Sequence, residues 1–99
     1  MAAVTAAELL TGVAMADAAH REQRNAFVEG LLNALPIEDY DLEVARAHAA
    51  LLAATHRAGR QRGSHDLIIA ATAVARGRTV VTTDPSGFDG LAGVSIRTG

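Results

Sequence analysis

The sequence predicts a layered α/β domain. Segments with helical periodicity alternate with short β-branched segments, and glycine or proline separates most of them. The segment "TVVTT", residues 79–83, has apolar residues on both faces, which is typical of an interior strand of a parallel sheet. A chain of 99 residues is the size of one domain, so we expect a single domain over residues 1–99.

The first part of the chain predicts two helices after the end of a short strand. "AAV", residues 2–4, is the candidate for this strand end. A helix then runs from Thr5, its expected side-chain cap, to about residue 17. A second helix covers about residues 19–35 and stops at Pro36, with "LPI" as a short extended segment.

The second part predicts two more helices and two strands. The basic loop "RAGRQRG" separates the helices, and the later helix is apolar nearly all round, so it should be buried. The strand "TVVTT" and a last strand, "VSI" at residues 94–96, follow. The residues expected to cap or end these helices are Asp41, Gly59, Ser64 and Gly77.

The composition excludes several kinds of protein. Cysteine is absent, which excludes disulfides, zinc ribbons and thiol catalysis, and lysine is absent, which excludes mechanisms that need a lysine side chain. A net charge of -2 gives no general attraction to nucleic acid or to a membrane surface. No apolar run approaches the ~20 residues of a membrane-spanning helix, and the N-terminus lacks a signal-peptide pattern. We therefore expect a cytoplasmic protein without membrane contact.

Asp66 and Asp84 stand at the ends of apolar segments. Asp84 follows "TVVTT", at the sheet edge where functional groups of α/β proteins gather, but an Asp-Pro pair is also a common turn opener. Asp66 lies in the first turn of its helix, where a carboxylate interacts favourably with the helix dipole without any site. Each aspartate has a functional and a structural interpretation.

Glu8 has the most specific structural explanation. "TAAE" fits a capping box, in which Thr5 and Glu8 cap each other's backbone amides. Taken together, however, Glu8, Asp66 and Asp84 are carboxylates at helix starts and a strand end, and such a set can converge on Mg²⁺. A magnesium site of this kind can activate water for attack on a phosphoryl group. Spacing alone leaves the choice open.

Two long segments carry a family resemblance. They are "AVTAAELLTGV" and "HDLIIAATAVARGRTVVTTDPSGFDGLAGVSI", with a helical middle between them. The most specific part is an aspartate that opens "LIIAATA", followed by glycine, an apolar strand and Thr-x-Asp. In this order the segments resemble the PIN-domain ribonucleases, most closely the VapC toxins of bacterial toxin–antitoxin pairs. The resemblance covers almost the whole chain.

The resemblance implies a PIN-like three-layer α/β/α domain with a short parallel sheet. It implies acidic residues that bind Mg²⁺ or Mn²⁺ and cleave RNA, usually tRNA or rRNA. Glu8, Asp66 and Asp84 match the family's catalytic metal ligands. Thr82 or Thr83 would supply a supporting hydrogen bond to a ligand or water. The implied partners are a VapB-type antitoxin and a second copy of the chain, with the helices of residues 5–35 as the contact surface.

The chain departs from the family pattern at two places. Family members begin with a central strand that carries a first aspartate, and we expect this strand to be missing here, through a misplaced start or a natural truncation. Relatives often carry an acidic residue directly before the phenylalanine of the last loop, where Gly87 stands. Asp89 follows that phenylalanine, and no metal role transfers to it. These differences predict activity well below that of a full-length relative.

The sequence leaves two functions open. The first is a Mg²⁺-dependent endoribonuclease toxin neutralised by a cognate antitoxin. The second is a truncated remnant, weak or inactive in catalysis, that only binds an antitoxin or an intact toxin subunit. A phosphoacceptor role for Asp84 is set aside, because receiver domains need a lysine beside the acceptor. Arg60 and Arg62 are candidates for RNA contacts, although surface charges in such loops are usually only solvated.

Overall fold

The computed structural model describes residues 1–98, which form two compact units. Unit 1 is Met1–Asp39 and unit 2 is Tyr40–Gly99. Within residues 1–98, no helix is both long and apolar enough to span a bilayer.

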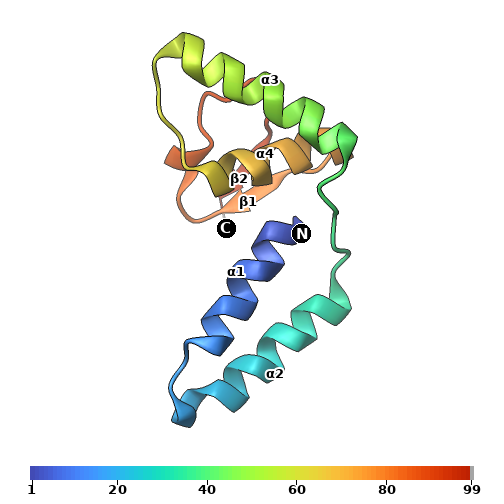
Figure 1. The fold of residues 1–99 in the computed structure, drawn as a ribbon, viewed down its shortest axis with the longest axis vertical. Helices are drawn as coiled ribbons and strands as arrows, with labels where there is room; N and C mark the ends of the chain where they lie inside the picture. The colour runs from blue at the N-terminus through green and yellow to red at the C-terminus, as the bar shows by residue number, and fades with distance from the viewer. Residues whose placement is uncertain (99) are drawn as a thin grey trace. The chain divides into compact units, whose positions relative to one another are not determined.

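Unit 1 is a hairpin of two antiparallel helices, α1 (Ala3–Ala14) and α2 (Ala18–Ala34), as Figure 1 shows. Val13 of α1 and Val28 of α2 are buried. Asp17 caps α2, because its Oδ1 accepts a hydrogen bond from the His20 N–H at 3.0 Å. The two predicted helices are therefore present, with α1 ending before Asp17 rather than at it.

The N-terminus of unit 1 pairs with the chain that follows α2. Ala2 and Glu38 form a parallel bridge. The Ala3 N–H donates to the Glu38 carbonyl at 3.0 Å, and the Glu38 N–H donates to the Met1 carbonyl at 2.8 Å. Residues 2–4 therefore contribute one bridge residue and then a helix, so the predicted strand end is shorter than expected.

The predicted capping box at the start of α1 is wrong. The N-cap is Ala2, which makes no side-chain capping bond, and Thr5 lies inside the first turn. The Thr5 N–H donates to the Ala2 carbonyl at 3.0 Å, as a backbone amide inside a helix does. Ala3 and Val4 are already helical, and alanine is the strongest helix former, so the helix begins before the expected cap.

Within residues 40–98, unit 2 contains two α-helices, one 3-10 helix and a small sheet. Its elements are α3 (Leu42–Ala58), α4 (Ser64–Arg76), β1 (Val80–Thr82), the 3-10 helix η1 (Pro85–Gly87) and β2 (Ile96–Thr98). In Figure 1, α3 lies beside α4, and α4 packs against both α3 and β1.

The core of unit 2 is built around α4. Ala70, Ala71 and Ala73 of this helix are buried, and side chains this small allow α3 to approach it closely. The other buried members of the core are Val44, Leu51, Leu67, Val80 and Phe88. The predicted burial of this helix is confirmed on most of its faces, although Val74 is 38% exposed.

The ends of α3 and α4 follow the sequence signals with one exception. Asp41 caps α3 by accepting a hydrogen bond from the Val44 N–H at 3.1 Å. Gly59 and Gly77 end the helices with φ of 68° and 64°, in the left-handed region that glycine adopts most readily. The exception is α4, which is capped by Gly63 without any side-chain bond, because Ser64 is already helical.

The sheet of unit 2 is parallel, as predicted. Val80 pairs with Ile96 and Thr82 with Thr98, so the last strand lies two residues beyond the expected "VSI". Among residues 1–98 this sheet has two strands. Val80 is buried, whereas Val81 is 66% exposed, so the apolar residues of β1 bury one face in the described part of the chain.

Asp41 makes the stability of unit 2 depend on pH. The Val44 N–H and the Arg76 guanidinium, 2.6 Å from Asp41 Oδ2, hold the pKa of Asp41 below its ordinary value of 3.8. A carboxyl whose pKa is lower in the folded than in the unfolded state stabilises the fold above its unfolded-state pKa. This stabilisation is lost as the pH falls through the folded-state pKa.

We expect Asp41→Asn to destabilise unit 2 at neutral pH and to have little further effect in acid. The measurement is the urea midpoint of both chains, followed by circular dichroism between about pH 7 and about pH 2.5. The matched control is Asp89→Asn, since the Asp89 carboxyl has no hydrogen bond or ion pair among residues 1–98. If the wild-type chain remains more stable than Asp41→Asn by the same amount down to the lowest pH, the Asp41 carboxylate is not the source of this stability.

Candidate functional site

The Asp66 carboxylate is lodged between two glycines. Asp66 lies in the first turn of α4 and is half-buried. A Cβ atom added at Gly87 would lie 2.7 Å from Asp66 Oδ2, and one added at Gly63 would lie 3.5 Å from it. Gly87 does not have a positive φ, so its lack of a side chain serves close approach to Asp66 rather than an unusual backbone. The turn after β1 is therefore in contact with the start of α4.

Asp84 opens that turn. Its Oδ1 accepts a hydrogen bond from the Ser86 hydroxyl at 2.5 Å and one from the Ser86 N–H at 3.3 Å. Its own N–H donates to Thr82 Oγ1 at 3.1 Å. The interpretation of Asp84 as a turn opener is confirmed, and it does not conflict with a functional role, because a carboxylate has acceptor positions beyond those Ser86 uses. The Thr83 side chain makes no hydrogen bond within residues 1–98.

Phe88 and Arg62 fix the turn against the rest of unit 2. Phe88 is 6% exposed and belongs to the core. Arg62 donates from Nη1 to the Ser86 carbonyl at 3.0 Å, and from Nη2 to the Asp89 carbonyl. These carbonyls flank Gly87, so one guanidinium group holds the segment that contacts Asp66. The expectation that Arg62 is only solvated is therefore wrong.

The start of α4 and the turn after β1 form a corner of unit 2, and the ligand atoms that it offers suit a hard cation. Asp66 and Asp84 offer carboxylate oxygens, which Mg²⁺ and Mn²⁺ prefer, and the chain has no cysteine that would favour a softer metal. Within residues 1–98, no three His, Asp or Glu side chains form a group positioned to hold a metal ion. Glu8 is exposed on α1 and belongs to unit 1, so its part in a metal site stays a prediction.

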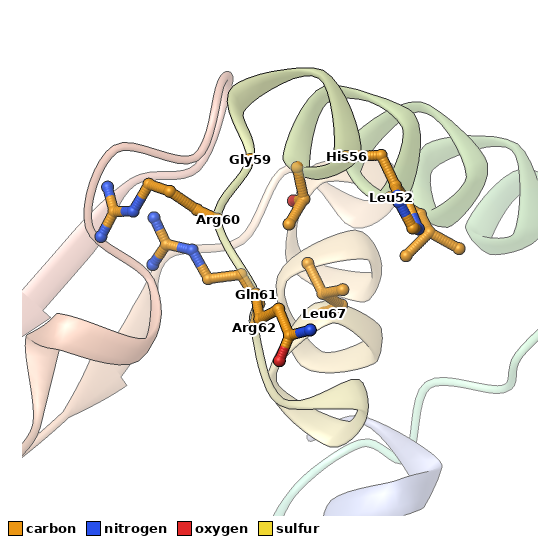
Figure 2. A pocket seen from close by; sticks show the side chains of 8 residues that line it. Leu52, His56, Gly59, Arg60, Gln61, Arg62 and Leu67 are labelled. Carbon is orange, nitrogen blue, oxygen red and sulfur yellow. The ribbon is translucent and has the colours of Figure 1, made fainter.

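A cavity of about 400 Å³ opens beside the basic loop. Figure 2 shows the side chains that line it. It is formed by the last turns of α3, the loop that follows them, and the start of α4. The residues that line it are Leu52, Thr55, His56, Gly59, Arg60, Gln61, Arg62 and Leu67. These residues lie within one continuous stretch, residues 52–67, and the packing of α4 against α3 across the loop arranges them around the cavity.

Sequence reasoning missed two supporting residues of the site. The sequence distinguishes Gly87 only by the acidic side chain that it lacks, whereas its contact with Asp66 sets how closely the turn approaches α4. Glycine is a common residue where two segments approach closely, and this is the one signal the sequence offers at Gly87. Arg62 had no such signal, because its acceptors are backbone carbonyls more than twenty residues away.

We expect Gly87→Ala to displace the Asp66 carboxylate. The added Cβ would overlap Asp66 Oδ2, which must rotate or shift to make room. The expected loss of stability is about 1 kcal/mol, at the low end of overpacking costs, because the end of a side chain yields more easily than backbone. The measurement is the change in backbone amide chemical shifts of Asp66 and Gly63 in a ¹⁵N spectrum, together with the urea midpoint.

The matched control for this prediction is Gly12→Ala. An added Cβ at Gly12 has no atom within 4 Å, and alanine is favoured over glycine inside a helix, so this variant should be slightly more stable than wild type. If Gly87→Ala leaves the Asp66 amide unshifted, the contact between these residues is not as close as described.

A family model described as PIN domain matches residues 1–94 of the chain. The VapC ribonuclease Y4jK of Sinorhizobium fredii is 38% identical over 100 aligned positions, which cover 97% of this chain and 71% of that protein. The tRNA(fMet)-specific endonuclease VapC of Salmonella typhimurium is 33% identical over 98 positions, which cover 98% of this chain and 72% of that protein.

Solved structures agree with the sequence comparisons. The crystal structure of DNA-bound VapBC from Salmonella typhimurium matches with a TM-score of 0.89 and 32% identity. The match covers 98% of this chain and 72% of that chain. At this level of similarity the two chains share a fold.

Proposed function

This chain belongs to the PIN-domain family and resembles its VapC toxins, and from that membership we propose that it is a metal-dependent endoribonuclease neutralised by a VapB-type antitoxin. The α/β class and the PIN fold predicted from the sequence are confirmed. The observation within this chain that carries the proposal is the contact between the Asp66 carboxylate and the turn that Asp84 opens. We also propose that residues 1–99 act as one domain, a proposal supported by a family match that runs through both units.

The proposed ligands of Mg²⁺ or Mn²⁺ are Glu8, Asp66 and Asp84. When bound, such a cation lowers the pKa of water and offsets negative charge on a phosphoryl group during in-line attack. The protein's own part is to hold the carboxylates in position for the cation. Without the cation, these carboxylates would repel the RNA backbone. Asp66 is held by its contact with Gly87 and by the N-terminal dipole of α4. Asp84 is held through Ser86 and Thr82.

The proposed substrate is structured RNA, with tRNA or rRNA as the class to test. The name of the Salmonella typhimurium relative supports tRNA as the first substrate. Because the proposed substrate and antitoxin are cytoplasmic molecules, we also propose that the chain acts in the cytoplasm. The antitoxin is supported by the VapBC complexes among the solved relatives, and its binding surface is proposed on the helices of unit 1.

We expect the purified chain to cleave total tRNA or rRNA in the presence of Mg²⁺ or Mn²⁺ and to lose this activity in EDTA. Asp66→Asn should lower the cleavage rate by about a hundredfold or more, because charge stabilisation of the transition state depends on the cation that Asp66 is proposed to hold. Glu8→Gln and Asp84→Asn should have effects of the same order. The measurement is the initial rate of fragment formation on denaturing gels.

The matched control is Asp89→Asn, which removes a carboxylate from the same turn without touching a proposed ligand. If Asp66→Asn cleaves as fast as wild type, the activity comes from a contaminant and the proposed site fails. If the folded wild-type chain cleaves none of these RNAs with either cation, the endoribonuclease proposal fails for this chain. Binding of an antitoxin without cleavage would then identify it as a remnant that acts only by binding.

Unit 1 also supports the proposed homodimer. It exposes large apolar side chains, with Met15 81% and Phe27 64% exposed, which is more than a solvated helical hairpin needs. We expect Phe27→Ser to shift the chain from dimer to monomer in sedimentation velocity experiments at micromolar concentration. Asn25→Ser, at an exposed polar position of the same helix, is the control. A dimer that is equally stable in both variants would place the subunit contact elsewhere.

A further inference from the structure

Arg60 and Arg62 bring their guanidinium groups to the same point of the loop after β1. A Cβ atom added at Gly90 would lie 3.4 Å from Arg60 Nη1 and 3.6 Å from Arg62 Nη2. Like charges this close repel each other. Among residues 1–98, neither arginine forms an ion pair with a carboxylate. The two positive charges are therefore held together without a negative partner from the described chain.

The two arginines differ in how many of their hydrogen-bond donors are already used. Arg62 spends donors of both terminal nitrogens on the Ser86 and Asp89 carbonyls, which anchor it in place. The Arg60 side chain has no hydrogen bond or ion pair among residues 1–98. A guanidinium carries five N–H donors in a planar fork that matches a phosphate. An anchored cation beside an unpartnered one is an arrangement that a bound phosphate would complete.

The cavity beside these arginines has the other properties of a nucleotide subsite. Its volume of about 400 Å³ lies within the range of ligand pockets. Leu52 and Leu67 provide an apolar surface for a base, and Gln61 carries both a donor and an acceptor. Figure 2 shows Arg60 and Arg62 extending from the loop on the side away from Leu52 and His56.

Electrostatics place the phosphate and the base within this subsite. The C-terminal end of α3 borders the cavity, and a helix C-terminus is unfavourable for an anion. The phosphate therefore belongs with the guanidinium groups, and the uncharged base belongs against the leucines. A base can enter such a cavity only when it is not stacked in a duplex, so the ligand is single-stranded at this position.

We propose that Arg60, Arg62 and the adjacent cavity form a subsite for one unpaired nucleotide of the RNA substrate, with Arg60 on its phosphate and Gln61 on its base edge. The inference rests on the proposed ribonuclease function and adds where the substrate is held. The loop that carries these residues leads directly into α4, so Arg62 precedes Asp66 by four residues and Arg60 precedes it by six.

The test is binding of a fluorescein-labelled single-stranded RNA octamer, measured by anisotropy over a series of KCl concentrations in EDTA. The full-length chain is used in an Asp66→Asn background, so that no RNA is cleaved. Arg60→Met should weaken binding about tenfold, the effect of losing one charge-assisted hydrogen-bonded contact. It should also reduce the slope of log K against log salt by about 0.7, the value for one contact to single-stranded phosphate.

Two further variants control this measurement. Arg57→Met removes an equal charge from the last turn of α3, at an exposed position that does not line the cavity, and should bind almost as well as the parent. Arg60→Lys keeps the charge and should keep the salt slope. Equal binding by Arg60→Met and Arg57→Met, with both variants folded by circular dichroism, would overturn the phosphate contact.

The base contact is tested with octamers of U, A or C. Gln61→Ala should reduce the differences in affinity among these three RNAs, and an unchanged order and spread would overturn the role of Gln61. A DNA octamer bound as tightly as the RNA, with the same dependence on Arg60, would overturn the assignment to RNA. Binding that depends on Arg60 in a wild-type chain that cleaves nothing would support the subsite while removing the ribonuclease proposal. If the wild-type chain cleaves RNA and Arg60→Met cleaves it equally fast, the ribonuclease proposal stands and the subsite is overturned.

Discussion

The close packing of α4 against α3 and β1 is the constraint on which the rest of unit 2 depends. Ala70 and Ala71 are fully buried, so the helix has no room to shift without opening or crowding the core. The helix α4 and the strand β1 that follows it run in opposite directions. The start of α4 and the end of β1 therefore lie at the same edge of unit 2. Asp66 and Asp84 are therefore neighbours by topology, although a whole helix separates them in the chain.

The turn after β1 is held in a fixed position against the start of α4. Phe88 anchors the turn in the core, Gly87 allows it to touch Asp66, and Arg62 holds the carbonyls on either side of the contact. Each of these residues acts on a different part of the turn, so the position of Asp84 does not depend on its own hydrogen bonds alone. A site built on such a supported turn can hold its geometry better than one on an unanchored loop.

Opposite charges are separated within this corner of unit 2, even though the whole chain carries a net charge of only -2. The carboxylates at the start of α4 and the end of β1 repel a phosphate until a cation is present, whereas the guanidinium groups at Gly90 attract one in any conditions. The two proposals for this chain divide the work accordingly. Under these proposals, the carboxylates would hold the divalent metal and the arginines would hold the RNA backbone.

The sequence by itself predicted the helices and the parallel pairing of the strands, because periodicity, Asp41 and the terminal glycines are local signals. The assignment of Glu8, Asp66 and Asp84 to a metal site stays a prediction. The sequence misplaced the starts of α1 and α4, where alanine propensity and a glycine cap outweighed Thr5 and Ser64. Only the tertiary structure decided the contact of Gly87 with Asp66, the anchoring role of Arg62 and the grouping of the cavity residues. The contacts of Gly87 and Arg62 depend on distances between segments far apart in the chain, and the cavity depends on how α4 packs against the end of α3. The packing of the core sets both, rather than any local pattern.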